Sequence, residues 1–150
     1  MKNLRSGGSG KRRYEFIEHT ADIAIRAYGD DIEQAFACAA GAMFDIMTDN
    51  SPVKPEQEIE FEIDSLDLEG LLVGFLSHLI VLHEVNGLVL TDFSIRFDGP
   101  GKLRVKTKGE KFDAARHRHG HHVKGVSYHM MEIDEGSKKR PASVQVLFDV

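Results

Sequence analysis

Two carboxylates, an imidazole and a hydroxyl stand together in one short segment near the start of the chain, Glu18-His19-Thr20-Ala21-Asp22. Apolar residues alternate with polar ones on both sides, which places the segment between two expected strands. The last strand-like run of the chain carries one acid, Asp149, directly before the terminal Val150. If these two segments meet, Asp22, Asp149 and the terminal carboxylate bring negative oxygen atoms together. Such groups repel one another unless they share a cation or a proton.

Oxygen ligands of this kind suit a hard divalent ion such as Ca²⁺ or Mg²⁺, and a chain end adds carbonyl and carboxylate oxygens. A simpler interpretation is that Asp22 caps a turn and that Asp149 is a solvated charge at the end of a strand. Spacing alone favours the simpler interpretation, because short motifs often fail to mark a site.

Two further groups of residues could also carry chemistry. The histidine-rich run at residues 117–122 has no neighbouring cysteine, and its interleaved arginines disfavour a tight cation site, so we expect an exposed, partly cationic loop. In the following run, residues 123–129, Lys124 could orient a phosphate or a carboxylate. The alternative is a lysine on an edge strand, where it discourages aggregation. The sequence contains no recognisable catalytic triad, P-loop or dinucleotide-binding fingerprint.

The 150 residues fit one domain, and their charge is unevenly distributed. The chain has a net charge of −5, of which residues 1–13 contribute +5, so that residues 14–150 carry −10. We expect residues 1–13 to be a flexible basic tail and residues 14–150 to be the folded domain. A body this acidic is a poor general binder of nucleic acid, because phosphate neutralisation requires concentrated Lys and Arg.

The sequence also predicts the compartment. The basic tail has no apolar segment of the secretory type, and the longest apolar run, residues 71–82, is too short to span a bilayer. The single cysteine, Cys38, excludes an internal disulfide framework. We therefore expect a cytoplasmic protein without a membrane partner.

Apolar periodicity predicts an α+β domain with two main helices packed against a largely antiparallel β-sheet, in the order β-β-α-β-α-β-β-β-β. The first helix is expected to begin at an N-cap at Asp30. The second is expected to begin after Asp67 and to end at Asn86-Gly87. Because its middle is apolar nearly all round, we expect the second helix to be the central core helix. A turn is expected at Lys108-Gly109.

Taken together, four segments resemble the archease family: residues 14–22, 35–44, 123–129 and 148–150. The similarity covers residues 14–150, and its most specific marks are the His-Thr-Ala-Asp run and the penultimate aspartate. The resemblance implies a small non-enzymatic cofactor protein that activates an RtcB-type RNA ligase in tRNA splicing and RNA repair. It would promote guanylylation of the ligase and multiple turnover. The family is also linked to a chaperone-like role toward tRNA methyltransferases, so tRNA would be contacted only indirectly.

The resemblance further implies a divalent-ion site, most often holding Ca²⁺, with Mg²⁺ and Mn²⁺ as alternatives. Its ligands fall on Asp22, Asp149 and Val150. Lys124 and Glu18 match positions that the family uses functionally, and the histidines His19 and His129 are expected beside the site. Two departures stand out, because the family usually has Asp in place of Glu18 and a Pro-Gly sequence after the position of His117.

A rival interpretation from another class is a metal-dependent phosphoester hydrolase that uses the same carboxylates. Metal-assisted hydrolysis requires an open coordination position and a base placed to activate water. His19 or His129 would be that base. Turnover of generic phosphoester substrates by the protein alone distinguishes this interpretation from a non-enzymatic activator.

Overall fold

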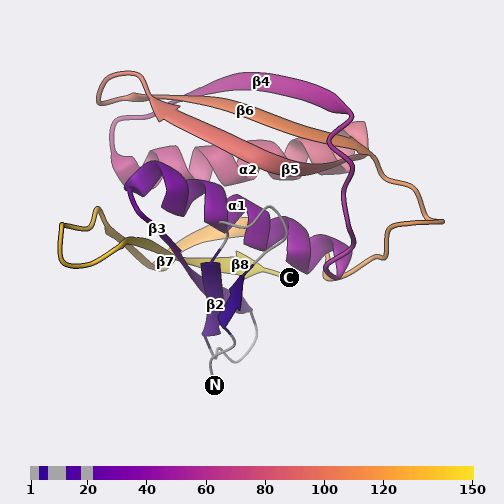
Figure 1. Cartoon of the computed structure of the whole chain (residues 1–150), viewed down its shortest axis with the longest axis horizontal. Coiled ribbons are helices and arrows are strands. Elements are labelled where there is room, and N and C mark those ends of the chain that lie inside the picture. The colour runs from indigo at the N-terminus through magenta and orange to yellow at the C-terminus, as the bar shows by residue number, and fades with distance from the viewer. Residues whose placement is uncertain (1–3, 7–12, 18–21) are drawn as a thin grey trace.

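The computed structural model describes residues 4–6, 13–17 and 22–150 of the chain (Figure 1). The elements follow one another in the order β1 (Leu4–Ser6), β2 (Arg13–Ile17), β3 (Ile23–Gly29), α1 (Ile32–Thr48), β4 (Gln57–Asp64), α2 (Leu68–Asn86), β5 (Leu88–Phe97), β6 (Lys102–Lys111), β7 (Gly125–Asp134) and β8 (Ala142–Asp149). The predicted α+β class and the predicted order of elements are confirmed. Strand β1, which the sequence analysis did not predict, lies within the basic tail and pairs with β2.

The strands form two antiparallel sheets rather than one. The larger sheet has the order β1-β2-β3-β8-β7, and the smaller sheet has the order β4-β6-β5. Both helices lie between the sheets, so that the fold has three layers (Figure 1). Helix α1 packs against β3 and β8 on one side and β5 on the other, whereas α2 packs against β7 and β4. The apolar core therefore fills the space on both sides of the helix layer.

The central core helix is α1, and the prediction that it would be α2 is wrong. Helix α1 buries most of its residues because its many alanines let both sheets approach closely: Ala35, Phe36, Cys38, Ala39, Ala40, Gly41, Ala42, Met43, Phe44, Ile46, Met47 and Thr48. Helix α2 buries a single stripe: Leu71, Leu72, Phe75, Leu76, Leu79 and Ile80. It is long and apolar enough to cross a membrane by length and composition alone, but that stripe packs into the protein core.

Both helices begin at aspartate caps, although one of the two differs from the prediction. The N-cap of α1 is Asp31 rather than Asp30, and its Oδ1 accepts a hydrogen bond from the N–H of Gln34 at 2.8 Å. The predicted cap of α2 is confirmed, because Asp67 Oδ1 accepts the N–H of Gly70 at 2.7 Å. Gly87 ends α2 in the left-handed conformation at φ 67°, as its glycine predicts.

The expected turn at Lys108-Gly109 is not present, because β6 continues to Lys111. Gly109 pairs with Leu90 of β5 and with Gln57 of β4. A Cβ at position 109 would lie 2.0 Å from the carbonyl oxygen of Val89. The glycine therefore allows the backbones of β5 and β6 to approach closely inside the sheet. A glycine required for close packing cannot be told from a turn glycine by sequence alone.

Candidate cation site at the chain end

The pairing of β3 with β8 brings the predicted ligands to one end of the larger sheet. In the antiparallel register Ile23 lies opposite Phe148. Asp22 and Asp149 each stand one residue beyond this last pair, so they lie at the same end of the two neighbouring strands. Val150, with the terminal carboxylate, follows immediately. Asp22 and Asp149, 127 positions apart in sequence, thus lie at the same end of the larger sheet.

Strand β7 brings Lys124 to the same place. The N–H of Lys124 donates to the backbone oxygen of Asp149 at 2.7 Å, and Gly125 pairs with Asp149. A Cβ at position 125 would lie 3.8 Å from Asp149 Oδ2, so the carboxylate of Asp149 leans toward β7. Both Asp149 and Lys124 are exposed to solvent, and Asp22 is half-buried. The charges at this edge are therefore accessible to an ion or to a partner.

The remaining candidates are placed differently. Glu18 and His19 lie outside the described residues. His129 lies in a part of β7 where the register shifts between Ser127 and Glu132, and its N–H donates to Ser127 Oγ at 2.9 Å. Ser127 already pairs with Leu147, two residues before Asp149, and His129 is further along the strand. The fold thus brings the backbones of Asp149 and Lys124 into contact and leaves Asp22 one residue beyond the last pair of β3 and β8, whereas His129 lies further along β7.

The donor set at this edge fits a hard divalent ion, because all the groups are oxygens and two are carboxylates from neighbouring strands. Within residues 4–6, 13–17 and 22–150, no three His, Cys, Asp or Glu side chains gather to hold a metal ion. A cation bound by Asp22 and Asp149 would therefore need oxygen atoms of Val150 as further protein ligands.

A pocket of about 360 Å³, lined mostly by apolar and neutral residues, adjoins this end of the sheet at Ile23, the neighbour of Asp22. The C-terminal end of α1 contributes Asp45 and Asp49, and the carboxylate of Asp45 accepts the hydroxyl of Tyr14 at 2.9 Å. A helix C-terminus carries a negative partial charge. Asp49 in turn lies 3.0 Å from Arg118, so both acids of the pocket have partners and the pocket is polar rather than strongly negative at this end of α1.

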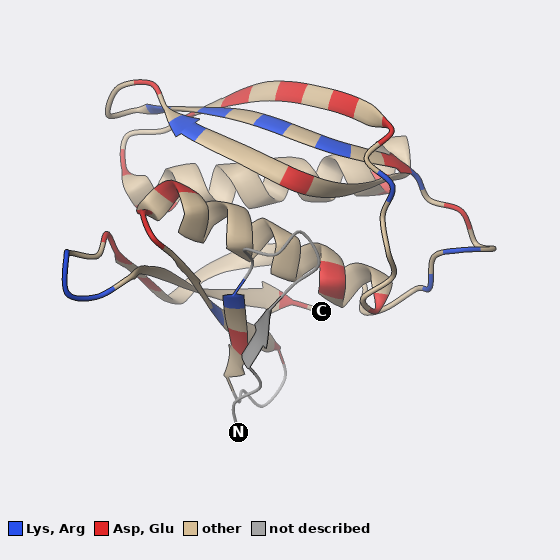
Figure 2. Ribbon diagram, viewed as in Figure 1, with Lys and Arg blue, Asp and Glu red and all other residues tan. Residues whose placement is uncertain are grey.

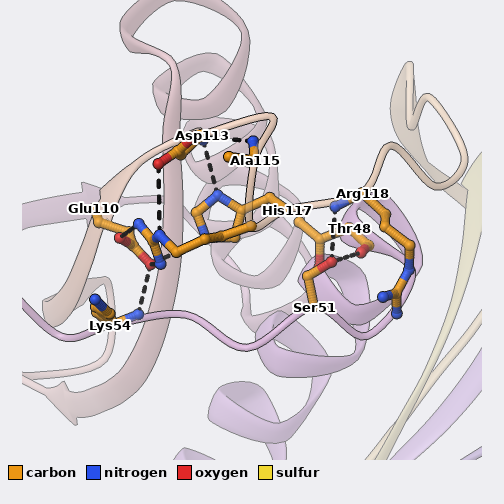
Figure 3. A network of polar contacts seen from close by, with 9 residues as sticks. Thr48, Ser51, Lys54, Glu110, Asp113, Ala115, His117 and Arg118 are labelled. Carbon is orange, nitrogen blue, oxygen red and sulfur yellow. Dashed lines mark hydrogen bonds and ion pairs between the residues drawn. The ribbon is translucent and has the colours of Figure 1, made fainter.

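The histidine-rich loop is only partly the exposed segment that the sequence predicted, because His117 is buried (Figure 3). Its Nδ1 accepts the N–H of Asp113 at 2.9 Å, and its Nε2 lies 3.0 Å from Glu110 Oε2. An Nδ1 that accepts carries no proton, so the ring proton is on Nε2 and is donated to Glu110. His117 is thus a structural hydrogen-bonding residue, whereas His119, His121 and His122 are exposed.

Glu110 is the centre of this network and is only 3% exposed. Besides His117, its carboxylate accepts the N–H of Lys54 at 2.7 Å and two hydrogen bonds from the guanidinium of Arg116. The Arg116 hydrogen bond is the main cause that lowers the pKa of Glu110 from 4.5 to about 2, and the bonds from Lys54 and His117 add to it. The carboxylate therefore remains ionised inside the protein, where it joins β6 to the loop.

The same loop covers the C-terminal end of α1. The N–H groups of Gly120 and His121 donate to the carbonyl oxygens of Met47 and Ile46 at 2.8 and 2.9 Å. Helix ends leave such carbonyls without partners inside the helix. The loop thus caps α1 and leads directly to Lys124, so it positions the start of β7 at the candidate site. The sequence carried no signal for this role, which depends on contacts across about 70 positions.

Comparison with known proteins shows the family of the chain. The model of the archease protein family matches residues 14–150. The protein archease of Pyrococcus furiosus is 44% identical over 126 residues, which cover 82% of this chain and 89% of that protein. The protein archease of Methanosarcina mazei is 36% identical over 139 residues, which cover 90% and 95%.

A solved structure has the same fold over nearly its whole length. The solution structure of Methanobacterium thermoautotrophicum protein 1598 aligns with a TM-score of 0.75 and 34% identity, covering 91% of this chain and 98% of that chain. The match therefore includes the two sheets, the helix layer between them and the strands that carry the candidate site. This chain belongs to the archease family.

Proposed function

We propose that this protein is a non-enzymatic, cation-binding activator of an RtcB-type RNA ligase. It would promote guanylylation of the ligase and multiple turnover in tRNA splicing and RNA repair, in the cytoplasm. The observation that carries the proposal is the register of β3 with β8, which leaves Asp22 and Asp149 as the next residues at the same end of two neighbouring strands. Membership of the archease family and the backbone contact of Lys124 with Asp149 support it.

Asp22, Asp149 and the terminal carboxylate of Val150 would hold the ion, with Ca²⁺ as the first candidate and Mg²⁺ or Mn²⁺ as alternatives. When bound, the ion supplies positive charge and Lewis acidity at an otherwise negative edge. The carboxylates keep this end of the sheet hydrophilic, and the backbone of Asp149 is held by its pairing with Gly125 of β7 and by the hydrogen bond from the N–H of Lys124.

An activator acts by binding one state of its partner more tightly than another, and it needs no catalytic residue of its own. The carboxylates of Asp22 and Asp149 offer a surface for a ligase site that is rich in cations. RNA would be reached only through the ligase. The same surface would serve a chaperone-like contact with a tRNA methyltransferase.

Calorimetric titration with Ca²⁺ tests the ion site directly. Asp149→Asn removes one ligand charge but keeps the backbone contact with Lys124, so we expect the fold to be retained and Ca²⁺ affinity to fall at least tenfold, as for a lost charged ligand. Asp134→Asn is the matched control, because it removes one charge from the opposite end of the β7–β8 pair. Equal affinity of Asp149→Asn and the unsubstituted protein would remove Asp149 from the ligand set.

Multiple-turnover RNA ligation by a cognate RtcB-type ligase, with substoichiometric amounts of this protein, tests the activity. We expect stimulation by the unsubstituted protein and by Asp134→Asn, and loss of stimulation in Asp149→Asn. Absence of stimulation by the unsubstituted protein would contradict the activator function. Turnover of a generic phosphoester by the protein alone would instead favour the hydrolase, although the placement of His129 away from Asp149 does not favour it.

A further inference from the structure

A shallow groove of about 570 Å³ crosses the outer face of the β4-β6-β5 sheet, on the side away from the helices. Its lining comes from all three strands: Glu60, Phe61, Glu62, Ser94, Arg96, Arg104, Val105 and Lys106. Figure 2 shows acids along β4 beside bases along β6. The groove therefore has one acidic wall and one basic wall.

Most charges on this face are paired with one another. Lys106 lies 3.2 Å from Glu60, and Arg104 lies 3.3 Å from Glu62. The guanidinium of Arg104 also donates to Asp98 at 2.8 Å, and this contact is the main cause that lowers the pKa of Asp98. A face of complete ion pairs would offer little to a charged ligand.

Arg96 is the exception. In the register of β5 and β6 it lies directly opposite Arg104, and like charges in that position destabilise a sheet. Arg96 is exposed and forms no ion pair with any of the described residues. Ser94 and Lys106, which are also opposite one another, stand next to this arginine pair. Among the described residues, Arg96 is thus the cation of the groove lining without an ion-pair partner, and the ion-paired Arg104 and Lys106 and the hydroxyl of Ser94 stand beside it.

This set of donors is suited to a phosphate group. Guanidinium groups bind phosphate oxygens with two parallel hydrogen bonds, and a dianion relieves the repulsion between two arginines. The carboxylates of Glu60 and Glu62 lie two strands from Arg96, which is about 10 Å at the usual strand spacing, although Glu62 is only 3.3 Å from Arg104. Because carboxylates accept hydrogen bonds, Glu60 and Glu62 would suit hydroxyl or amino groups at the end of the ligand away from its phosphate.

We propose that this groove binds the phosphomonoester of a nucleotide-sized ligand through Arg96 and Arg104, with Glu60 and Glu62 accepting hydrogen bonds from its sugar or base. The volume lies within the usual range of small-molecule sites, roughly 300–1,000 Å³. The groove belongs to the smaller sheet, whereas the candidate cation site belongs to the larger one. The proposal therefore stands independently of the ligase-activator function.

Nuclear magnetic resonance titration of the full chain with adenosine 5′-monophosphate tests the proposal. We expect amide shifts concentrated on β4, β5 and β6, and weaker shifts with adenosine, which lacks the phosphate. Arg96→Gln should weaken binding of the monophosphate about tenfold, because it removes a charge-assisted contact. Lys108→Gln is the matched control, since it removes one charge from the same sheet but lies outside the groove lining.

A second titration distinguishes two sources of the phosphate. If an oligoribonucleotide binds only when it carries a 5′-phosphate, the ligand is an RNA end. If only the monophosphate binds, the ligand is a free nucleotide. The proposal is overturned if no groove residue shifts at millimolar monophosphate, if adenosine binds equally well, or if Arg96→Gln and Lys108→Gln behave alike. The spectrum of each variant without ligand verifies its fold.

Discussion

Glu110→Gln should destabilise the protein in a way that depends on pH. The side chain is 3% exposed and accepts hydrogen bonds from Lys54, Arg116 and His117. Glutamine has nearly the same size, so it leaves no cavity. It removes the negative charge and places an amide donor where the surrounding groups also donate. The substitution therefore tests the electrostatic part of the network rather than its packing.

The magnitude follows from the pKa of Glu110. A pKa lowered from 4.5 to about 2 corresponds to on the order of 3 kcal/mol in favour of the ionised form in the folded protein. The Arg116 side chain is 36% exposed, and solvent screening reduces the contribution of such a pair. We therefore expect Glu110→Gln to lower the free energy of unfolding at pH 7 by roughly 2 kcal/mol, which corresponds to a loss of roughly 4–8 °C in Tm for a chain of this size.

The pH dependence has a definite sign. The folded pKa of Glu110 is below its unfolded value, so its stabilisation is complete above about pH 4.5 and is lost as the pH falls toward 2. The difference in unfolding free energy between the unsubstituted protein and Glu110→Gln should thus be constant from pH 7 to about pH 5. By pH 3 it should have fallen to roughly half or less.

Urea unfolding followed by circular dichroism at pH 7, 5 and 3 measures these differences. Asp134→Asn is the control, because the pKa of Asp134 is also lowered to about 2 by Arg140, yet this pair is exposed. We expect the control to have a much smaller effect than Glu110→Gln at every pH. Equal effects of the two substitutions at pH 7, or a Glu110→Gln effect that does not change down to pH 3, would refute the assignment of this stabilisation to the buried charge.

Two further substitutions test local contacts. Gly120→Ala would place a Cβ 2.0 Å from the carbonyl oxygen of Ile46, so we expect the loop to lose its contacts with the end of α1, with faster amide exchange at residues 120 and 121. Unchanged exchange there would show that the loop adapts. Asp67→Ala removes the hydrogen bond to Gly70 at the start of α2 and should cost about 1 kcal/mol in thermal unfolding, whereas Asp67→Asn, which also caps helices well, should cost clearly less.

The sequence by itself determined the class of the fold and the candidate ligands. Local patterns suffice for both, because alternation and helical periodicity depend on neighbouring residues. The caps at Asp67 and Gly87 are likewise local, since each side chain or backbone angle acts within one turn of its helix. That Asp22 and Asp149 stand at the same end of the sheet could also be proposed, because each acid adjoins a β-prone segment and the two segments lie at the two ends of the domain.

Only the tertiary structure decided which helix is central and what the histidine-rich loop does. Burial of α1 depends on the sheets that lie on both of its sides, and composition alone does not show this. His117 and Glu110 are polar in sequence but buried in the fold, because Asp113, Arg116 and Lys54 supply hydrogen bonds that no local pattern reveals. The position of Arg96 opposite Arg104 depends on a strand register, which is fixed when distant segments pair.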